Sequence, residues 1–256
     1  MELTLSSYLI VLPLVFLAGF IDSIAGGGGL ISLPAYYLIG LPVDLAAGTN
    51  KMSAFFGTAV ATGRYAYSRR IPWKEGLWAL LGSVPFSFLG AELLKMLDGR
   101  IVKLSVLLAL PIVAAFVLLN KDSLKPRDLV GEKHRPAACF AIGALIGLYD
   151  GLVGPGTGTF LQLLFVSVIG LEVLMGSGAA RLVNLGSNVA ALASLAISGH
   201  VLYALALPAA AFGMAGNYLG SSLAISKGSR VIRGILLVVL ALLMGRLLLD
   251  VLGMYF

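Results

Sequence analysis

Long apolar runs dominate this chain and limit the folds that it can adopt. Hydrophobic residues make up 59% of its 256 residues and charged residues 12%, about half of the roughly 25% charge of an ordinary soluble domain. So few polar groups cannot cover the surface of a soluble fold of this size, and a disordered chain would be far less apolar. The runs are continuous rather than alternating, which favours membrane-spanning helices over a β-barrel.

The runs fall into two sets, each interrupted by one short member. About 20 helical residues are needed to cross ~30 Å of hydrocarbon, so the second run of each set, with 12 or 13 residues, is too short to span as a helix. The runs are 7–25, 30–41, 45–65, 76–97 and 101–119, then 136–153, 159–171, 173–197, 201–225 and 231–249.

The two sets match each other as a repeat. Asp22 and Asp150 each precede a glycine-rich segment by four residues, at an offset of 128; two inserted residues make the offset 130 thereafter. A coincidence of charged residues with glycines at one offset is hard to obtain by chance in so apolar a chain. The matches at 130 are Gly40 with Gly170, Gly48 with Gly178, Lys51 with Arg181, Gly90 with Gly220, Arg100 with Arg230 and Lys103 with Arg233.

Basic clusters predict the orientation of the halves. The clusters at 64–74, 121–135 and 227–233 together hold 12 of the 18 basic residues, and the positive-inside rule puts them in the cytoplasm. Each half then crosses an odd number of times, so the halves are inverted, as is typical of secondary transporters. The loop that carries Lys95, Arg100 and Lys103 would lie outside, against the rule.

We therefore predict an all-α polytopic membrane protein of two inverted-topology repeats. Each repeat has a Gly-broken re-entrant or discontinuous helix pair plus about three transmembrane helices. The first repeat covers 1–119, a charged cytoplasmic linker covers 120–135, and the second repeat covers 136–256. The start of the chain, Met1 and Glu2, has no basic region typical of a cleaved signal.

The glycine-rich segments interrupt apolar stretches where a helix would otherwise continue. Consecutive glycines cost roughly 1 kcal/mol each in a helix relative to Ala, and unpaired backbone groups in hydrocarbon cost several kcal/mol each. Such a break is tolerated where it lines a cavity, and the short helix after it would point free N–H groups and its positive dipole end there. A plain surface loop is the alternative. The predicted anion-binding residues are Gly26, Gly27, Gly28, Gly29, Gly156, Thr157, Gly158 and Thr159.

Lys51 and Arg181 lie at matched positions early in long apolar runs. A charge in the bilayer core costs roughly 2.5–3.5 kcal/mol, so each side chain either snorkels to an interface or faces an anion. Arg can hold two oxygens of an oxyanion, whereas Lys acts as a point charge.

Other polar residues lie inside the apolar runs. They either line a path for the substrate or bond neighbouring helices together. We include Asn50, Asn184 and Asn188 in the predicted substrate site; the others are Ser53, Thr58, Gln162, Ser187 and Asn217.

Asp22 and Asp150 each stand just before a break, inside an apolar run. A buried carboxylate has a raised pKa or a basic partner. The two are therefore candidates for proton coupling, or for ion pairs with Lys51 or Arg181 in the absence of substrate. A structural role in bonding the broken backbone is the alternative.

No motif for catalysis or nucleotide drive is present, so we expect neither an enzyme nor a cofactor. Cys139, His134 and His200 are the whole Cys and His inventory, and none lies at metal-ligand spacing. Basic residues are not interleaved with aromatics as in a nucleic-acid platform, so no nucleic acid is expected.

The stretch 19–29, with Pro34, residues 40–42 and residues 47–50, resembles the TauE/SafE sulfite exporter family, and the repeated pattern from Gly147 through Arg181 does so too. The resemblance covers nearly the whole chain. It implies a small inner-membrane carrier for sulfite, sulfonates or related anions, driven by the proton motive force. The second half departs from the family pattern at Pro155, Thr157 and residues 178–180.

Together these features predict a multi-pass secondary transporter of the cell inner membrane, with export as the direction that the resemblance implies. Its partners would be a small sulfur-containing anion, protons and the lipid bilayer, and it would act as a monomer or homodimer. The alternatives are a transporter or passive channel for another small anion, carboxylate or inorganic, and a membrane scaffold that transports nothing.

Overall fold

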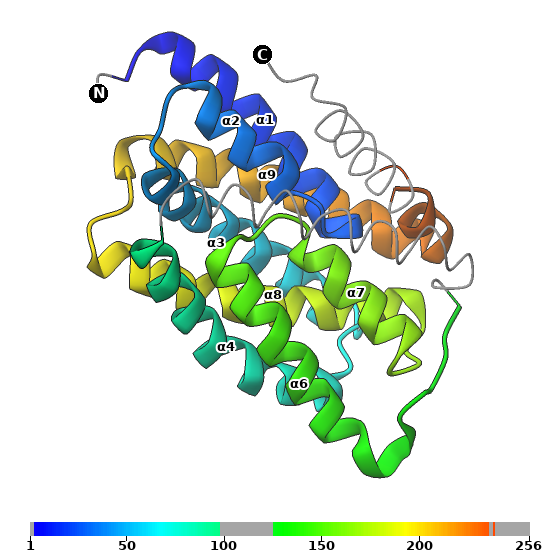
Figure 1. Cartoon of the computed structure of the whole chain (residues 1–256). Helices are drawn as coiled ribbons and strands as arrows, with labels where there is room; N and C mark the ends of the chain where they lie inside the picture. The colour runs from blue at the N-terminus through cyan, green and yellow to red at the C-terminus, as the bar shows by residue number, and fades with distance from the viewer. Residues whose placement is uncertain (1–2, 98–124, 236–237, 239–256) are drawn as a thin grey trace, which may run out of the picture.

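The computed structural model describes residues 3–97, 125–235 and 238. Eight helices lie entirely within these residues (Figure 1), and residues 229–235 are helical as well, in agreement with the predicted all-α class. The eight helices have the following bounds. They are α1 (Leu5–Ala25), α2 (Gly29–Leu38), α3 (Val43–Tyr67), α4 (Trp73–Met96), α6 (Gly131–Leu152), α7 (Thr157–Ser167), α8 (Val173–Ile197) and α9 (Tyr203–Lys227). The predicted run 101–119, most of the run 231–249, and the matched positions Arg100 and Lys103 lie outside the described residues.

Helices α1, α4 and α8 are each long and apolar enough to cross a membrane. The second run of each half forms a short helix, as predicted: α2 has 10 residues and α7 has 11. At 1.5 Å per residue these helices are about 15–17 Å long, roughly half of the hydrocarbon thickness.

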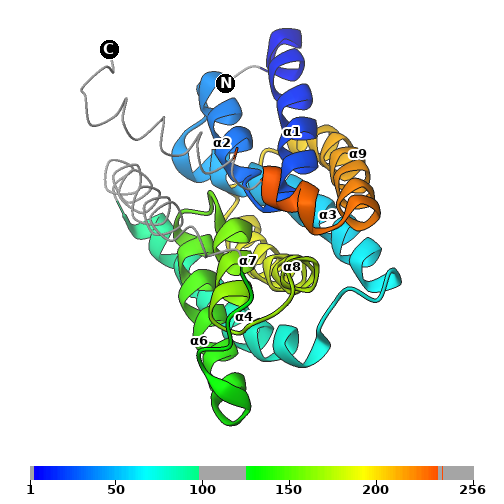
Figure 2. The ribbon, with the colours of Figure 1, turned by 90° about the vertical axis from the view of Figure 1, so that its right-hand side faces the viewer.

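Helices α3 and α8 cross at the centre, between an α1–α9 pair and an α4–α6 pair (Figure 2). The start of α3 packs against the end of α8, so closely that a Cβ on Gly48 would collide with the carbonyl oxygen of His200. In the same way, the start of α8 packs against the end of α3, and a Cβ on Gly178 would collide with the carbonyl oxygen of Arg70. The two contacts are related by the offset of 130 residues.

Glycines allow the outer pairs of helices to approach closely. Gly216 and Gly220 of α9 lie against the carbonyl oxygens of Phe16 and Phe20 of α1, where a Cβ would collide. The α4–α6 pair is packed in the same way, with glycines against the backbone of the neighbouring helix. These glycines therefore serve helix packing; the α6 members are Gly143, Gly147 and Gly151, which face Ala79, Ser83 and Ser87 of α4.

Helix α6 begins at Gly131, five residues before the predicted start of the second repeat at 136. Oδ1 of Asp128 accepts hydrogen bonds from the N–H groups of Gly131 (2.9 Å) and Val130 (3.3 Å), which satisfies donors that a helix start leaves free. Arg135 then forms ion pairs with Asp128 and with Glu75 of α4 (3.6 Å). These contacts extend the helix into the charged segment.

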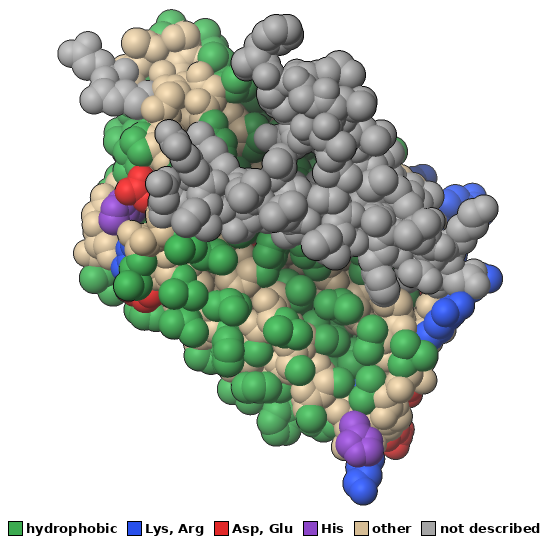
Figure 3. Space-filling model, in the orientation of Figure 1, with side chains coloured by type: hydrophobic (Ala, Val, Ile, Leu, Met, Phe, Trp, Pro, Cys, Tyr) green, Lys and Arg blue, Asp and Glu red, His purple; other side chains and the backbone are tan. Residues whose placement is uncertain are grey.

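The outer surface is apolar over the middle of the helices. Over the part of the face in Figure 3 that is not grey, green side chains predominate, and the charged groups lie toward its edges. Exposed large hydrophobic residues continue along α4, including Leu77, Leu81 and Leu89. An exposed apolar belt of this kind suits contact with lipid tails.

Candidate functional site

The two glycine-rich breaks meet at the centre of the molecule. The N–H group of Thr159 donates to the carbonyl oxygen of Gly26 (3.2 Å), and its hydroxyl donates to the carbonyl oxygen of Ala25 (2.8 Å). Gly26 has a left-handed φ of +85°, and a Cβ there would collide with the backbone of Gly158. Glycine is required at Gly26 for both reasons. The end of α1 therefore lies against the start of α7.

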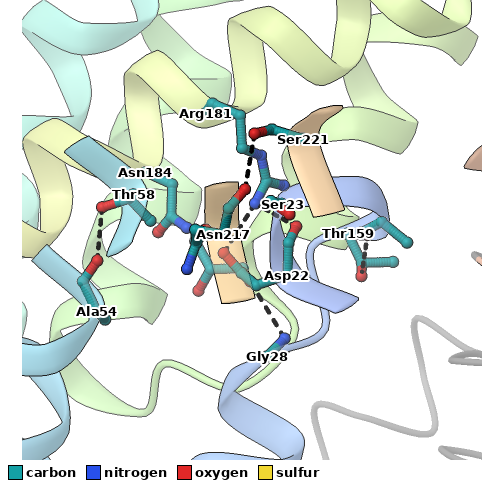
Figure 4. A network of polar contacts seen from close by, with 12 residues as sticks. Asp22, Ser23, Gly28, Ala54, Thr58, Thr159, Arg181, Asn184, Asn217 and Ser221 are labelled. Carbon is teal, nitrogen blue, oxygen red and sulfur yellow. Dashed lines mark hydrogen bonds and ion pairs between the residues drawn. The ribbon is translucent and has the colours of Figure 1, made fainter. Parts of the chain in front are cut away.

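Arg181 of α8 reaches the first break (Figure 4). Its side chain is fully buried, and Nη1 donates both to the carbonyl oxygen of Asp22 and to Oδ2 of the Asp22 carboxylate, the latter at 2.8 Å. Oδ1 of Asp22 accepts the N–H group of Gly28 at 3.1 Å. Nε and Nη2 of Arg181 have no hydrogen-bond partner among the described residues. The guanidinium thus keeps an unpaired edge. This edge lies beside the second break, where a Cβ on Gly158 would stand 2.5 Å from Nη2.

Lys51 of α3 reaches the second break. Its Nζ lies 2.7 Å from Oδ2 of Asp150 and donates to Oδ1 of Asn188 at 3.1 Å. The hydroxyl of Thr157 donates to Oδ1 of Asp150 at 2.7 Å and also to the carbonyl oxygen of Gly154. Lys51 is 5% exposed and Asp150 is 2% exposed, so this ion pair is closed to bulk solvent.

The two ion pairs are exchanged between the halves. The carboxylate of each half pairs with the cation of the other half. Both aspartates form the ion pairs that were one of their predicted roles. The Asp22 carboxylate also accepts a bond from the broken backbone at Gly28, whereas the Asp150 carboxylate bonds the side chain of Thr157. Snorkelling to an interface does not describe Lys51 or Arg181, because both side chains end inside the protein.

A cavity of about 60 Å³ lies between the breaks. It is lined mainly by α1, α2, α3, α8 and α9, together with both glycine-rich segments. Most of the predicted residues line it, whereas Gly27, Thr159 and Arg181 do not, and Arg181 instead pairs with the lining residue Asp22. The predicted residues on the wall are Asp22, Gly26, Gly28, Gly29, Asn50, Lys51, Asp150, Gly156, Thr157, Gly158, Asn184 and Asn188.

Several wall residues were absent from the predicted binding set. Ser53, Thr58 and Asn217 are polar residues inside apolar runs, which is the signal that could have included them. Nδ2 of Asn188 donates to Oγ1 of Thr58 at 3.4 Å, so Thr58 supports a predicted residue. Ser32 of α2 also lines the cavity, and nothing in its sequence position distinguishes it from other serines.

Groups of the protein itself already bond some of the N–H groups at the starts of α2 and α7. The N–H groups of Gly28 and Thr157 bond to the Asp22 carboxylate and to the Gly154 carbonyl oxygen. A carboxylate oxygen therefore stands at the start of α2, where the positive end of the helix dipole favours an anion. In the part of the chain that the structure describes, no group of three or more His, Cys, Asp or Glu residues could hold a metal ion.

A family model described as "Sulfite exporter TauE/SafE" matches residues 11–247. The chain belongs to this family. TauE/SafE membership makes it a multi-pass membrane transporter and not an enzyme, which agrees with its apolar belt and its long helices.

Relatives of this TauE/SafE chain share its length. "Probable membrane transporter protein ORF9" of Sinorhizobium sp is 37% identical over 239 residues, covering 92% of this chain and 90% of that protein. A "Probable membrane transporter protein" of Haemophilus influenzae is 30% identical over 239 residues, or 92% of each chain. "Probable membrane transporter protein YfcA" of Escherichia coli K12 is 30% identical over 234 residues, or 91% of this chain and 87% of that one. No solved structure matches the chain.

Proposed function

We propose that this protein is a secondary transporter of a small sulfur-containing anion, such as sulfite or an organosulfonate, and that it couples transport to protons. The observation that supports this most strongly is the buried pair of exchanged ion pairs at one central cavity. Lys51 and two glycine-rich helix starts line this cavity, and Arg181 pairs with its lining residue Asp22. Cations and helix starts both favour a negatively charged ligand. The substrate would bind at Lys51, at the backbone of both breaks, and beside Asn50, Asn184 and Asn188.

The charge balance gives a reason for proton coupling. Asp150 neutralises Lys51, and Asp22 neutralises Arg181, so these four groups together carry no net charge. An anion that approached this site would meet two carboxylates as well as two cations. Protonation of one carboxylate releases its cation to the anion, and each anion would then be accompanied by about one proton. Burial makes an uncompensated charge costly, which enforces this exchange.

The helix arrangement supports transport by alternating access. Helix α3 starts where α8 ends and α8 starts where α3 ends, while α1 pairs with α9 and α4 pairs with α6. These relationships are those expected of inverted repeats, whose two halves enclose a binding site near the bilayer centre. The substrate would be exposed first to one side and then to the other as one repeat rocks against the other.

The sulfur class of the substrate rests on the family and on the donors at the site. The family model carries the description of a sulfite exporter. A sulfite or sulfonate group presents several oxygens to a planar guanidinium, which can hold two of them. Asparagine side chains and glycine N–H groups can satisfy the remaining oxygens.

An anion panel tests the proposal directly. Purified protein in detergent is melted with sulfite, thiosulfate, sulfate, taurine, sulfoacetate, acetate or chloride at fixed pH and ionic strength. A ligand at 100 times its Kd stabilises by about 2.7 kcal/mol, which gives a clear rise in Tm. We expect sulfur oxyanions to raise Tm, and Lys51→Ala to remove the shift. Lys74→Ala, a basic residue that does not line the cavity, is the control and should keep it.

Two results would count against the proposal. If no anion raises Tm, the cavity is not an anion site, and a scaffold role takes precedence. If acetate or chloride alone gives a shift, the substrate class is a carboxylate or inorganic anion. Flux in liposomes then separates a carrier from a channel, because a carrier saturates and responds to a proton gradient, whereas passive flux through a channel does not depend on protons.

A further inference from the structure

The cavity is asymmetric, although the sequence that surrounds it is repeated. Its wall includes Ser32 of α2 and Gly213 and Asn217 of α9. The offset of 130 assigns to these positions Gln162 of α7 and Ser83 and Ser87 of α4. None of these three counterparts lines the cavity. The structure is therefore open on the side of α2 and α9 and packed on the side of α7 and α4.

The packed side contains polar groups without partners. Gln162 is fully buried, and neither its Oε1 nor its Nε2 has a hydrogen-bond partner among the described residues. Ser83 is also fully buried, and its Oγ has none. Buried side-chain amides are normally bonded because their desolvation is unfavourable. An apolar residue of the same size would be preferred at position 162 if packing were the only requirement.

Arg181 adds two unpaired donors to the same half of the molecule. Its Nη1 is bonded to Asp22, but Nε and Nη2 are unpartnered within the described chain. By the repeat, Arg181 has the place on the packed side that Lys51 has on the open side, where Lys51 lines the cavity. One cation thus faces the cavity, and its counterpart is enclosed.

We propose that Gln162, Ser83 and the free edge of Arg181 line a second anion-binding cavity, closed in this structure, which opens in the alternate state of the transporter. In that state the Ser32–Asn217 side closes, and the Gln162 amide and the Arg181 Nε–Nη2 edge bind the oxygens of the same small oxyanion. The inference rests on the proposed function and extends it by assigning residues to the half of the cycle that is not visible here. The matching Ser87 stays structural, because its hydroxyl already donates to the carbonyl oxygen of Ser187 at 2.8 Å.

Thiol labelling from each face of the membrane tests the second cavity. Cys139 is the single cysteine of the chain, so Cys139→Ser provides a cysteine-free background. Gln162→Cys, Ser32→Cys and the control Leu161→Cys, a core residue beside Gln162 on α7, are placed in it. Right-side-out and inside-out vesicles are treated with the impermeant reagent methanethiosulfonate ethylsulfonate, which is itself a small sulfonate.

We expect Ser32→Cys to be labelled from one face and Gln162→Cys from the opposite face, with at least a tenfold difference between faces for each. Leu161→Cys should stay unlabelled from both. If Gln162→Cys is unreactive from both faces, as Leu161→Cys is, while Ser32→Cys is labelled, the second cavity does not exist. The anion panel with Lys51→Ala would still stand in that case, so failure of this inference is distinct from failure of the proposed function.

A second position and a second readout guard against a variant that does not fold. Ser83→Cys should label from the same face as Gln162→Cys. Gln162→Leu, which removes the amide at similar volume, should lower anion flux at least tenfold without lowering Tm, because the amide makes no bond that packing would lose. Unchanged flux in Gln162→Leu would overturn a binding role for this residue; Leu161→Met is the flux control.

Discussion

Lys51 and Asp150, from opposite halves of the chain, form a buried ion pair with 2.7 Å between Nζ and Oδ2. Arg181 and Asp22 form the complementary pair at 2.8 Å. Each contact therefore joins the two halves as well as neutralising a charge, and a substitution at either pair should affect stability and anion binding together. The two effects can be separated by the choice of variant.

Removal of Lys51 alone should destabilise the protein strongly. Lys51→Ala leaves the Asp150 carboxylate buried without its cation, and loss of one partner of a buried pair costs about 3–5 kcal/mol. Lys51→Met combined with Asp150→Leu should recover most of this loss, because neither charge remains to be desolvated. Unfolding in detergent measures the stability of the single and the double variant. If the stability losses of the two single substitutions simply added in the double variant, that would contradict a direct pair.

Arg181→Lys should weaken anion binding although it conserves charge. Lysine offers a compact ammonium in place of the planar guanidinium, so it cannot both bond Asp22 and present a two-donor edge. We expect the Kd of the best anion to rise by about tenfold, or about 1.4 kcal/mol. Arg64→Lys is the matched control, since Arg64 contacts Ser222 and the ring of Tyr218 away from the cavity wall. An equal change in both variants would point to a general loss of stability.

Asp150→Asn should uncouple anion flux from protons. The amide cannot exchange a proton and leaves Lys51 permanently available to the anion. In liposomes, the acceleration of flux by a proton gradient should fall at least tenfold, while binding at neutral pH is kept or strengthened. Asp44→Asn, at the start of α3 where Oδ2 of Asp44 lies 3.0 Å from Nε2 of His200, should keep the gradient dependence. Full gradient dependence in Asp150→Asn would move the coupling role to Asp22.

Gly26→Ala should prevent correct assembly of the two breaks. Its Cβ would collide with the backbone of Gly158 in addition to the strain of a left-handed φ. Gly40 has nearly the same φ, +81°, with nothing within 4 Å of an added Cβ, so Gly40→Ala isolates the strain of about 1–2 kcal/mol. We expect Gly40→Ala to fold with a modestly lower Tm and Gly26→Ala to give little folded protein. Equal Tm values would mean that the breaks do not touch.

The start of α6 should depend on the charge of Asp128. The N–H group of Gly131, followed by the Arg135 guanidinium, holds the pKa of the Asp128 carboxyl below its usual range. A lowered folded pKa adds stability above the unfolded pKa of about 3.9 and loses it as pH falls through the folded pKa. The Tm of Asp128→Asn should therefore lie below that of the parent at pH 7, and the two should converge below about pH 4. A difference that is constant with pH would exclude the charge as the cause.

The predicted helices follow closely from the sequence because hydrophobic runs and glycine penalties act locally. The starts and lengths of α2 and α7 were predictable, since each follows a break and each run is short. The start of α6 was not, because it depends on Asp128 and Arg135 bonding across a turn and to Glu75 on another helix. Lys51, Arg181 and both aspartates stood out in the sequence as charges in apolar surroundings. The position of Ser32 on the cavity wall could be found only from the fold.

The sequence by itself determined that the chain is a helical membrane protein. It also predicted two matched halves, two backbone breaks and four charged residues in apolar surroundings, because each is a property of composition or spacing. Only the tertiary structure decided which carboxylate meets which cation. Asp22 and Arg181 are 159 positions apart, and their contact depends on how α1 and α8 pack. The asymmetry of the cavity was also decided there, because packing places Ser32 and Asn217 on its wall while their sequence counterparts Gln162 and Ser87 lie away from it.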